Sequence, residues 1–232
     1  MKTLHRRQSV RRLALLSGAV LALCGLLGAP AARAVTPPAL SQMAQALARV
    51  RGYQVTMQSA SAGYSSPISV TSAGTVVGRG KTLRLYVTTT THRAGQVSTL
   101  EEVFTGAHLC LRSRGQRAWS CSAAPSGTLT RLQSADPAQM AKALGLSQRY
   151  VPAGRQTKQG QSCMTYRFSF SVSGLHGRGT LWIARATALP VEEDTVSTLA
   201  LRTGAPPLVV RTTQHWSRWN DPRLTIPSVP AS

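Results

Sequence analysis

The strongest structural signal in this chain lies at residues 180–192, which read Thr180-Leu-Trp-Ile-Ala-Arg-Ala-Thr-Ala-Leu-Pro-Val-Glu192. Apolar residues recur at every second position on either side of the small residues 186–188: Leu181, Ile183, Leu189 and Val191. Such alternation is typical of strands that bury one face. The stretch therefore predicts a β-hairpin with an apolar face that another part of the chain must cover. Trp182 is expected on the opposite face from Leu181 and Ile183.

The same period of two recurs through most of the chain. Two further stretches show it clearly, and their apolar members are Leu83, Leu85 and Val87 in one and Met164, Tyr166, Phe168 and Phe170 in the other. Weaker patterns predict strands near residues 53–57, 75–77, 97–104, 107–111, 118–122, 195–202 and 208–216. Most of the chain is therefore expected to be β-structure.

Two segments have the period of a helix instead. Leu40, Met43, Leu47 and Val50 recur at spacings of three and four, which predicts an amphipathic helix over about 39–51. Asp136-Pro137 is a typical helix start, with Asp as the cap and Pro at the first position. It predicts a second helix over about 137–144.

This order of elements indicates the fold class. Strands and helices do not alternate along the chain, so a parallel sheet is not expected. We predict an α+β fold: one long, curved antiparallel β-sheet, a half-barrel, with two helices covering its concave face. Glycines within or beside the strands are the places where such a sheet can bend, namely Gly78, Gly80, Gly106 and Gly179.

Residues 1–34 have the features of a secretory signal peptide: a basic start, an apolar run over 13–27 and the ending Ala32-Arg33-Ala34. The run is shorter than the ~20 residues that a retained membrane anchor needs. Arg11-Arg12 partly matches a twin-arginine signal, so the export route stays open. We interpret Cys24 as part of the signal core, because Leu23 stands where a lipoprotein signal has a small residue. Residues 35–232 are then a single exported domain, located in the periplasm, at the cell surface or outside the cell.

The exported domain is strongly basic. Six of the 27 Lys and Arg lie in residues 1–34, which leaves 21 cations against seven acids, a net charge of +14. Such a charge favours anionic partners, such as a membrane or another envelope surface. The cations are scattered along the sequence and no recognition motif occurs, so nucleic acid is not an expected partner. The expected state is a monomer.

Three cysteines follow the signal peptide: Cys110, Cys121 and Cys163. An oxidising compartment favours one disulfide, and the odd count leaves one thiol. Cys110 with Cys121 and Cys121 with Cys163 are both open pairings. Metal-ligand spacing is lacking around His108-Leu109-Cys110, so neither a metal site nor another cofactor is indicated.

The opening helix with Tyr53 starting the first strand, together with two short motifs, resembles the LolA-like superfamily of bacterial envelope lipoprotein and lipid carriers, with its LppX/LprG-type members. Leu181-Trp182-Ile183 with Thr187–Val191 is similar to the family's W-I-D-x-x-T-G-L-P hairpin, although Ala184 replaces Asp and Ala188 replaces Gly. Residues 216–227, from Trp216 through Asn220-Asp221-Pro222 to Pro227, are similar to its Y-x-x-Y-N-x-P ending. The resemblance implies a half-barrel whose helices plug an apolar cavity for acyl chains. It implies no catalysis and no polar site.

The expected function is therefore the binding or carrying of a lipid or a lipidated protein. The residues expected to line the cavity are Leu83, Leu85, Val87, Met164, Tyr166, Phe168, Phe170, Leu181 and Ile183. An ordinary filled core would give the same pattern. A second hypothesis is a non-carrier sensor or interaction module that holds an anionic partner on its basic surface.

Catalysis is not indicated. Adjacent carboxylates on a strand point to opposite faces, so Glu101-Glu102 is a poor catalytic pair. Asp136 is expected to cap a helix, and Glu192-Glu193-Asp194 is interpreted as a solvated turn. His108 and His215 are single histidines on strands, and no nucleophile or phosphate-loop motif occurs. A hydrolase that uses these histidines is the third and least favoured hypothesis.

Overall fold

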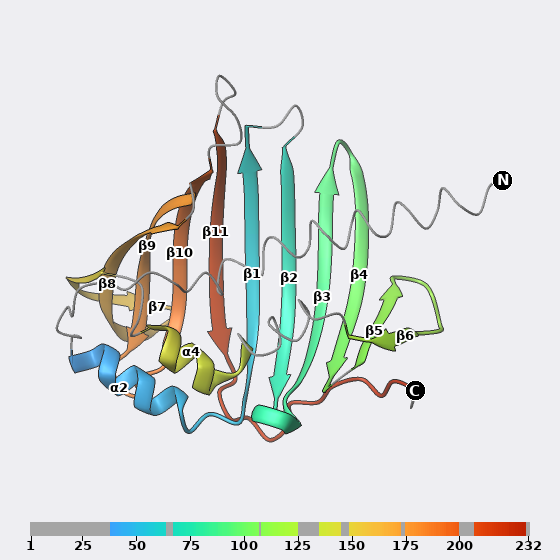
Figure 1. Cartoon of the computed structure of the whole chain (residues 1–232). Coiled ribbons are helices and arrows are strands. Elements are labelled where there is room, and N and C mark those ends of the chain that lie inside the picture. The colour runs from blue at the N-terminus through green and yellow to red at the C-terminus, as the bar shows by residue number, and fades with distance from the viewer. Residues whose placement is uncertain are drawn as a thin grey trace.

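The computed structural model describes residues 38–63, 67–106, 108–124, 135–144, 149–172, 175–199 and 207–230. These residues form two α-helices, one short 3-10 helix and a single 11-stranded sheet (Figure 1). The helices are α2 (Pro38–Leu47), α4 (Pro137–Leu144) and the 3-10 helix η2 (Gly80–Thr82). The strands are β1 (Gly52–Ala62), β2 (Ile68–Val77), β3 (Arg84–Arg93), β4 (Gln96–Thr105), β5 (His108–Ser113), β6 (Ser120–Ala123), β7 (Arg149–Lys158), β8 (Gln161–Val172), β9 (Leu175–Ala184), β10 (Pro190–Leu199) and β11 (Leu208–Ser217).

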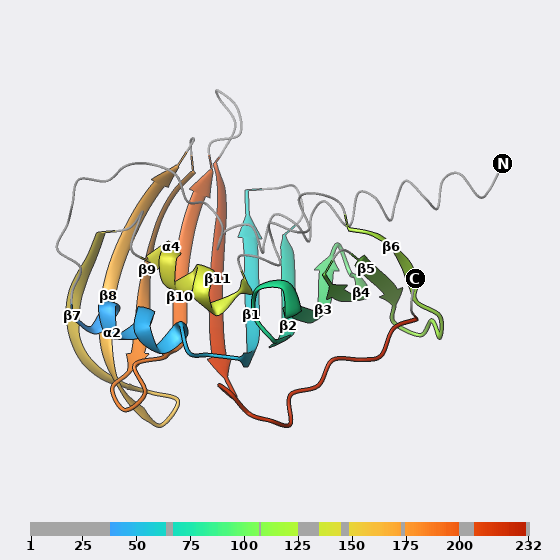
Figure 2. The same cartoon turned by 60° about the horizontal axis from the view of Figure 1, so that its bottom comes forward.

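The sheet consists of two meanders joined in the middle. Its strand order is β6-β5-β4-β3-β2-β1-β11-β10-β9-β8-β7, and each neighbouring pair is antiparallel. The pairing of β1 with β11 joins the two meanders, while β6 and β7 are the open edges. The sheet is curved, and both helices lie against the half that contains β7–β11 (Figures 1 and 2). The predicted antiparallel half-barrel is confirmed.

We call the side of the sheet that the helices cover the inner face and the opposite side the outer face. Helix α2 packs on the inner face through Leu40, Met43 and Leu47, which are at most 2% exposed. Full burial of such a side chain stabilises the fold by about 1.5–3 kcal/mol. These three contacts are therefore enough to fix the helix on the sheet.

The first helix ends earlier than predicted, at Leu47 rather than near residue 51. Val50 is buried in the inner core as its periodicity indicates, but it belongs to a turn in which its N–H donates to the Leu47 carbonyl at 3.0 Å. The backbone of Arg51 is hydrogen-bonded to the residue that follows β2, because the Arg51 carbonyl accepts from the Gly78 N–H at 2.8 Å. The helix therefore has to stop before Arg51.

The interpretation of Glu192-Glu193-Asp194 as a solvated turn is wrong. All three residues lie within β10, which pairs with β9 on one side and β11 on the other. The chain reverses earlier, where Ala188 N–H donates to the Ala184 carbonyl at 2.8 Å. Strand β10 thus unites the second arm of the hairpin with most of the strand expected at 195–202. The hairpin itself is confirmed.

The disulfide joins Cys110 to Cys121, which face each other directly across β5 and β6. The alternative pairing of Cys121 with Cys163 is wrong, because Cys163 lies on β8 in the other meander and is a buried free thiol. Burial raises the pKa of Cys163, which keeps the thiol protonated and unreactive. The bridge therefore fastens the short edge strand β6 to its neighbour.

Candidate ligand-binding site

The predicted lining residues all lie in one apolar cluster on the inner face. Most are buried, and Met164 and Phe170 are half-buried. They form two groups, one at β3 and one on β8 and β9. Both groups belong to the same cluster as α2 and the side chains of Tyr53, Phe104 and Trp216. The structure thus brings the predicted residues together. Their role in lining a cavity, rather than filling a core, stays a prediction.

A row of aromatic rings forms one end of this inner wall. Tyr150 of β7, which the sequence analysis missed, contacts the rings of Tyr166 and Phe168, with centroid distances of 6.5 Å and 5.4 Å. Phe168 and Phe170 stack at 6.4 Å. Both phenyl rings lie over glycines of β9, where a Cβ atom would come within 2.2 Å of Phe170 at Gly177 and 2.5 Å of Phe168 at Gly179. Because glycine has no side chain, the two rings can lie flat on the sheet at these positions.

Glu193 is the unexpected member of the inner face. Its register partners are Leu181 and Gln214, so its half-buried side chain lies on the apolar side of β10. No described residue forms a hydrogen bond or ion pair with its carboxyl group. Burial first, and the charge of Asp194 second, raise the pKa of Glu193 to about 7. Burial and the charge of Glu193 likewise raise the pKa of Tyr150 above its ordinary range. An ionisable group with such a pKa in an apolar wall is typical of a functional site.

The second helix is attached differently from the first. Asp136 caps α4 as predicted, since its Oδ1 accepts a hydrogen bond from the Ala138 N–H at 2.9 Å. Its Oδ2 accepts another from the Gly80 N–H of η2 at 2.9 Å. The Tyr53 hydroxyl donates to the Ala135 carbonyl at 2.8 Å. Pro137 is fully buried, and Met140 and Ala141 are half-buried against the core, so apolar contacts and these polar tethers together attach α4.

This arrangement of sheet and helices is found in a known structure. LprF from Mycobacterium bovis matches with a TM-score of 0.61 and 14% sequence identity, over 87% of this chain and 99% of that chain. The chain has the fold of LprF. The LolA-like resemblance in the sequence is thereby confirmed at the level of the fold.

Two other solved structures are more distant from this LprF-like fold. A DUF1329 family protein from Desulfovibrio piger matches with a TM-score of 0.32 and 12% identity, over 80% of this chain and 92% of that chain. A domain from Vibrio parahaemolyticus, named for outer membrane lipoprotein sorting, matches with a TM-score of 0.29 and 10% identity, over 79% and 92%. Neither similarity is strong enough to carry an argument. No protein-family model and no curated protein matches the sequence.

On the outer face of the LprF-like sheet, Trp182 packs as predicted, against Cys163, Ala184 and Val191. Its Nε1 donates to Gln156 Oε1 at 2.8 Å, and Lys158 Nζ lies 4.4 Å from the ring centroid. Lys158 also forms an ion pair with Glu192, whose Oε2 lies 2.8 Å from His215 Nδ1. Glu192 is only 3% exposed because these partners replace its water.

The described residues contain neither a cluster suited to a metal ion nor a helix suited to crossing a membrane. Among them, no group of three or more His, Cys, Asp or Glu is arranged to hold a metal ion. Within the same residues, no helix is long and apolar enough to cross a membrane.

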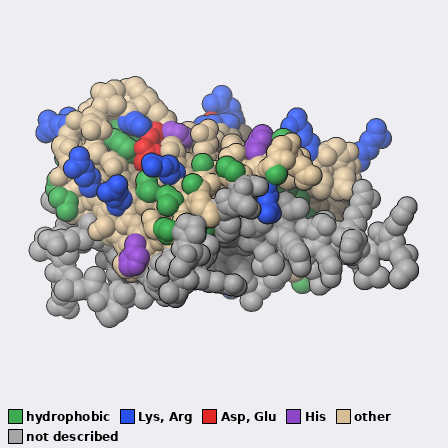
Figure 3. Space-filling model, turned by 90° about the horizontal axis from the view of Figure 1, so that it is seen from above, with side chains coloured by type: hydrophobic (Ala, Val, Ile, Leu, Met, Phe, Trp, Pro, Cys, Tyr) green, Lys and Arg blue, Asp and Glu red, His purple; other side chains and the backbone are tan. Residues whose placement is uncertain are grey.

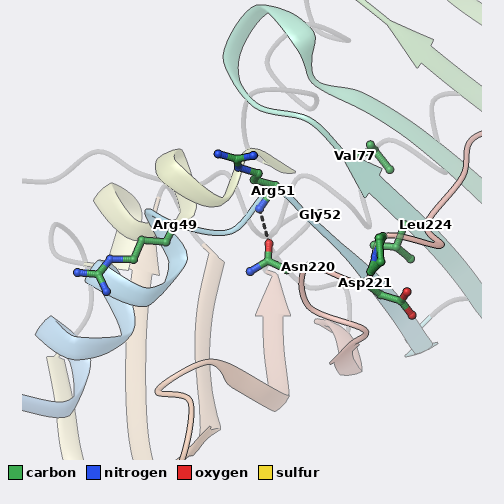
Figure 4. A pocket seen from close by; sticks show the side chains of 8 residues that line it. Arg49, Arg51, Gly52, Val77, Asn220, Asp221 and Leu224 are labelled. Atoms are coloured by element: carbon green, nitrogen blue, oxygen red, sulfur yellow. Dashed lines mark hydrogen bonds between the residues drawn. The ribbon is translucent and has the colours of Figure 1, made fainter.

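The protein also has a pocket of about 430 Å³ at one end of the central strands, between the end of α2, the start of β1 and the turn after β11 (Figure 4). Asn220, which belongs to the closing motif at residues 216–227, fixes this turn. Asn220 Oδ1 accepts a hydrogen bond from the Arg51 N–H at 2.6 Å, and the Asn220 N–H donates to the Gly52 carbonyl at 2.8 Å. The ring of Trp219 contacts that of Tyr53 in a tilted arrangement, with a centroid distance of 5.0 Å. The closing motif therefore ties the end of β11 to the start of β1.

Proposed function

We propose that this chain is an exported, non-catalytic protein that binds or carries a lipid or a lipidated protein in the apolar interior of its half-barrel. The observation that carries this proposal is the inner wall of apolar and aromatic side chains beneath a helix, α4, that polar tethers hold in place. Each methylene moved from water into such an interior is worth about 0.8 kcal/mol. An acyl chain can therefore compete with this helix for the same surface.

The polar groups that were considered for catalysis have structural partners, which supports a binding role. Asp136 caps α4. Glu101 forms an ion pair with Arg112 on the outer face, while Glu102 lies on the inner face, as expected for neighbours on a strand. His215 is engaged with Glu192. A hydrolase using these groups would first have to break these contacts.

Export is supported by the signal-peptide features of residues 1–34, which lie outside the described residues. The Cys110–Cys121 disulfide suits an oxidising compartment. Exported carriers meet lipid at the envelope, where a basic surface would favour contact with anionic membranes.

Lipid binding is tested by native mass spectrometry of the purified protein and by uptake of cis-parinaric acid, which fluoresces in apolar surroundings. Co-purifying lipid or saturable uptake is the expected result. Phe170→Asp places a charge on the inner wall and should abolish uptake. Ser169→Asp is the matched control, because Ser169 is exposed on the outer face of the same strand. Preparations without lipid and without uptake would contradict the proposal, as would equal losses in both variants.

The second candidate function is a non-carrier module that holds an anionic partner on its basic surface. Seen from above, however, Lys and Arg side chains are spread along the molecule and separated by uncharged surface (Figure 3). That distribution gives no single docking patch on this face, which is why we prefer the carrier. The two functions differ in salt dependence, because binding to a basic surface weakens steeply as ionic strength rises, whereas acyl-chain burial does not.

A further inference from the structure

The inner face changes from apolar to polar along β10 and β11, and Glu193 lies where the two parts meet. At the end of β11, Trp216 belongs to the buried apolar cluster that includes α2. Farther along the same face, Thr195 of β10 pairs in register with Thr212 of β11. Glu193 pairs with Gln214, which lies midway between Thr212 and Trp216. A ligand whose hydrocarbon chain lies on the apolar part can therefore have its polar end at Glu193.

The neighbouring described elements supply no cation to the Glu193 carboxylate. The strands beside β10 each contain a single Lys or Arg, which is Arg178 in β9 and Arg211 in β11. Both are register partners of Val196. Because side chains alternate along a strand, Val196 and these two arginines lie on the opposite face from Glu193. Helix α2 contains no charged residue. A cation that pairs with Glu193 is thus best supplied by a ligand.

A second polar group on the inner face is also unused. Trp216 is only 5% exposed, and no described residue accepts a hydrogen bond from its buried Nε1. A buried donor without a partner costs about 1–3 kcal/mol, unless a ligand or water accepts from it. Trp216 is a diagonal neighbour of Glu193, because Glu193 pairs with Gln214, two residues before Trp216. An unused donor and an unused carboxylate therefore lie close together, as the polar end of an amphiphile requires.

The aromatic part of the inner wall favours the same sign of charge. The charge of Glu193 contributes to the raised pKa of Tyr150, so the two groups lie within electrostatic range of each other. The Tyr150 ring contacts Tyr166 and Phe168. The faces of such rings attract cations. A carboxylate near aromatic rings suits a cationic group and repels an anionic one.

We propose that Glu193 is a specificity-determining residue of the inner face, and that it selects an amphiphile whose polar end carries an ammonium group over one whose polar end is anionic. The ammonium group binds the carboxylate, and the hydrocarbon chain lies along the apolar wall. This inference rests on the proposed function, because an amphiphile must first enter the inner face.

Displacement of N-phenyl-1-naphthylamine, an uncharged dye that fluoresces in apolar surroundings, tests the inference. The competitors are decylamine, 1-decanol and decanoate, which have the same chain length and differ in charge. At pH 8, Glu193 is ionised because its pKa is about 7. Decylamine should then bind at least about tenfold more tightly than decanoate, with decanol between them, since hydrogen bonds between charged groups are the strong ones.

Glu193→Gln keeps the shape of the side chain and should remove most of this preference. Asp194→Asn is the matched control, because it removes the same charge from the neighbouring position. Asp194 pairs with Thr180 and Thr213, which places it on the outer face. The control variant should keep the preference for decylamine at pH 8.

The outcomes separate this inference from the carrier function. If the dye binds but the wild type shows no preference for decylamine over decanoate, the inference is overturned and the carrier function stands. An unchanged preference in Glu193→Gln, or an equal loss in Asp194→Asn, would also overturn the inference alone. A wild-type protein that binds neither the dye nor any lipid would overturn the carrier function and this inference together.

Discussion

The ring of Phe168 lies directly over Gly179, its register partner across β8 and β9. A Cβ atom at Gly179 would come within 2.5 Å of both the Phe168 ring and the Asp194 carbonyl oxygen. Glycine is therefore required at this position so that the aromatic ring can lie against the sheet.

Replacing Gly179 by alanine should lower the free energy of unfolding by about 1–3 kcal/mol, because a well-packed interior resists added atoms. Chemical denaturation measures the change. Gly74→Ala is the matched control, since the nearest neighbour of its Cβ would be the movable Val55 side chain, at 3.0 Å. A smaller loss is expected there, and equal losses would contradict the steric explanation.

Ala188 occupies a strained backbone position at the turn of the central hairpin. Its φ is +55°, in the left-handed region, where the LolA-like motif has glycine. A left-handed L-residue costs about 1–2 kcal/mol, part of which is offset by the lower unfolded-state entropy of alanine. Ala188→Gly should thus stabilise the protein by about 0.5–1 kcal/mol in thermal or urea unfolding. Ala186→Gly, in the same turn but without a positive φ, should give no gain.

Glu193 should make stability depend on pH. Its pKa is about 7 in the folded state and near the ordinary 4.5 when unfolded, so the folded protein binds more protons between these values. The free energy of unfolding therefore falls as pH rises from about 4.5 to about 7, by roughly 3 kcal/mol, and it levels off above that.

The matched variant for this titration is Glu193→Gln, which keeps the shape and removes the charge. Urea unfolding at several pH values should show a flatter profile than the wild type and a higher stability at pH 8. Parallel profiles for the two proteins would show that Glu193 is not buried as described.

Tyr53 should control how readily α4 leaves the inner face. Tyr53→Phe removes the hydrogen bond to the Ala135 carbonyl, which should cost about 0.5–1.5 kcal/mol and speed cis-parinaric acid uptake in stopped-flow fluorescence. Tyr86→Phe is the control, because the Tyr86 hydroxyl accepts from Thr88 Oγ1 at 3.0 Å on the outer face. It should leave the uptake rate unchanged, and a similar acceleration in both would refute the tether role.

Local sequence patterns were sufficient to predict the position of a residue where that position depends only on the residue's own strand or helix. Period two placed Leu181 and Phe168 on the inner face and Trp182 on the outer face, and Asp136-Pro137 marked the start of α4. The position of Glu193 was not predicted, because three consecutive acidic residues are typical of a solvated turn. Their burial depends instead on the pairing of β10 with a strand on each side. The disulfide likewise depends on the register of β5 with β6.

The pocket was beyond any local pattern, since Arg51 and Asn220, which fix its backbone, are 169 residues apart. Unpaired arginines also look the same in a sequence whether they point to bulk water or surround a concavity. Figure 4 shows the side chains of Arg49 and Arg51 pointing in different directions, away from each other.

The pairing of β1 with β11 has a consequence for how the chain folds. Within each meander, strands adjacent in sequence pair with each other, so each half can form through short loops. The β1–β11 seam must instead close most of the chain in one step, at a greater loop-closure entropy. We expect this seam to form last and to limit the rate of refolding, because its contacts join distant parts of the chain. During synthesis, β1 at the end of the first meander cannot pair with β11 until the ribosome has released β11.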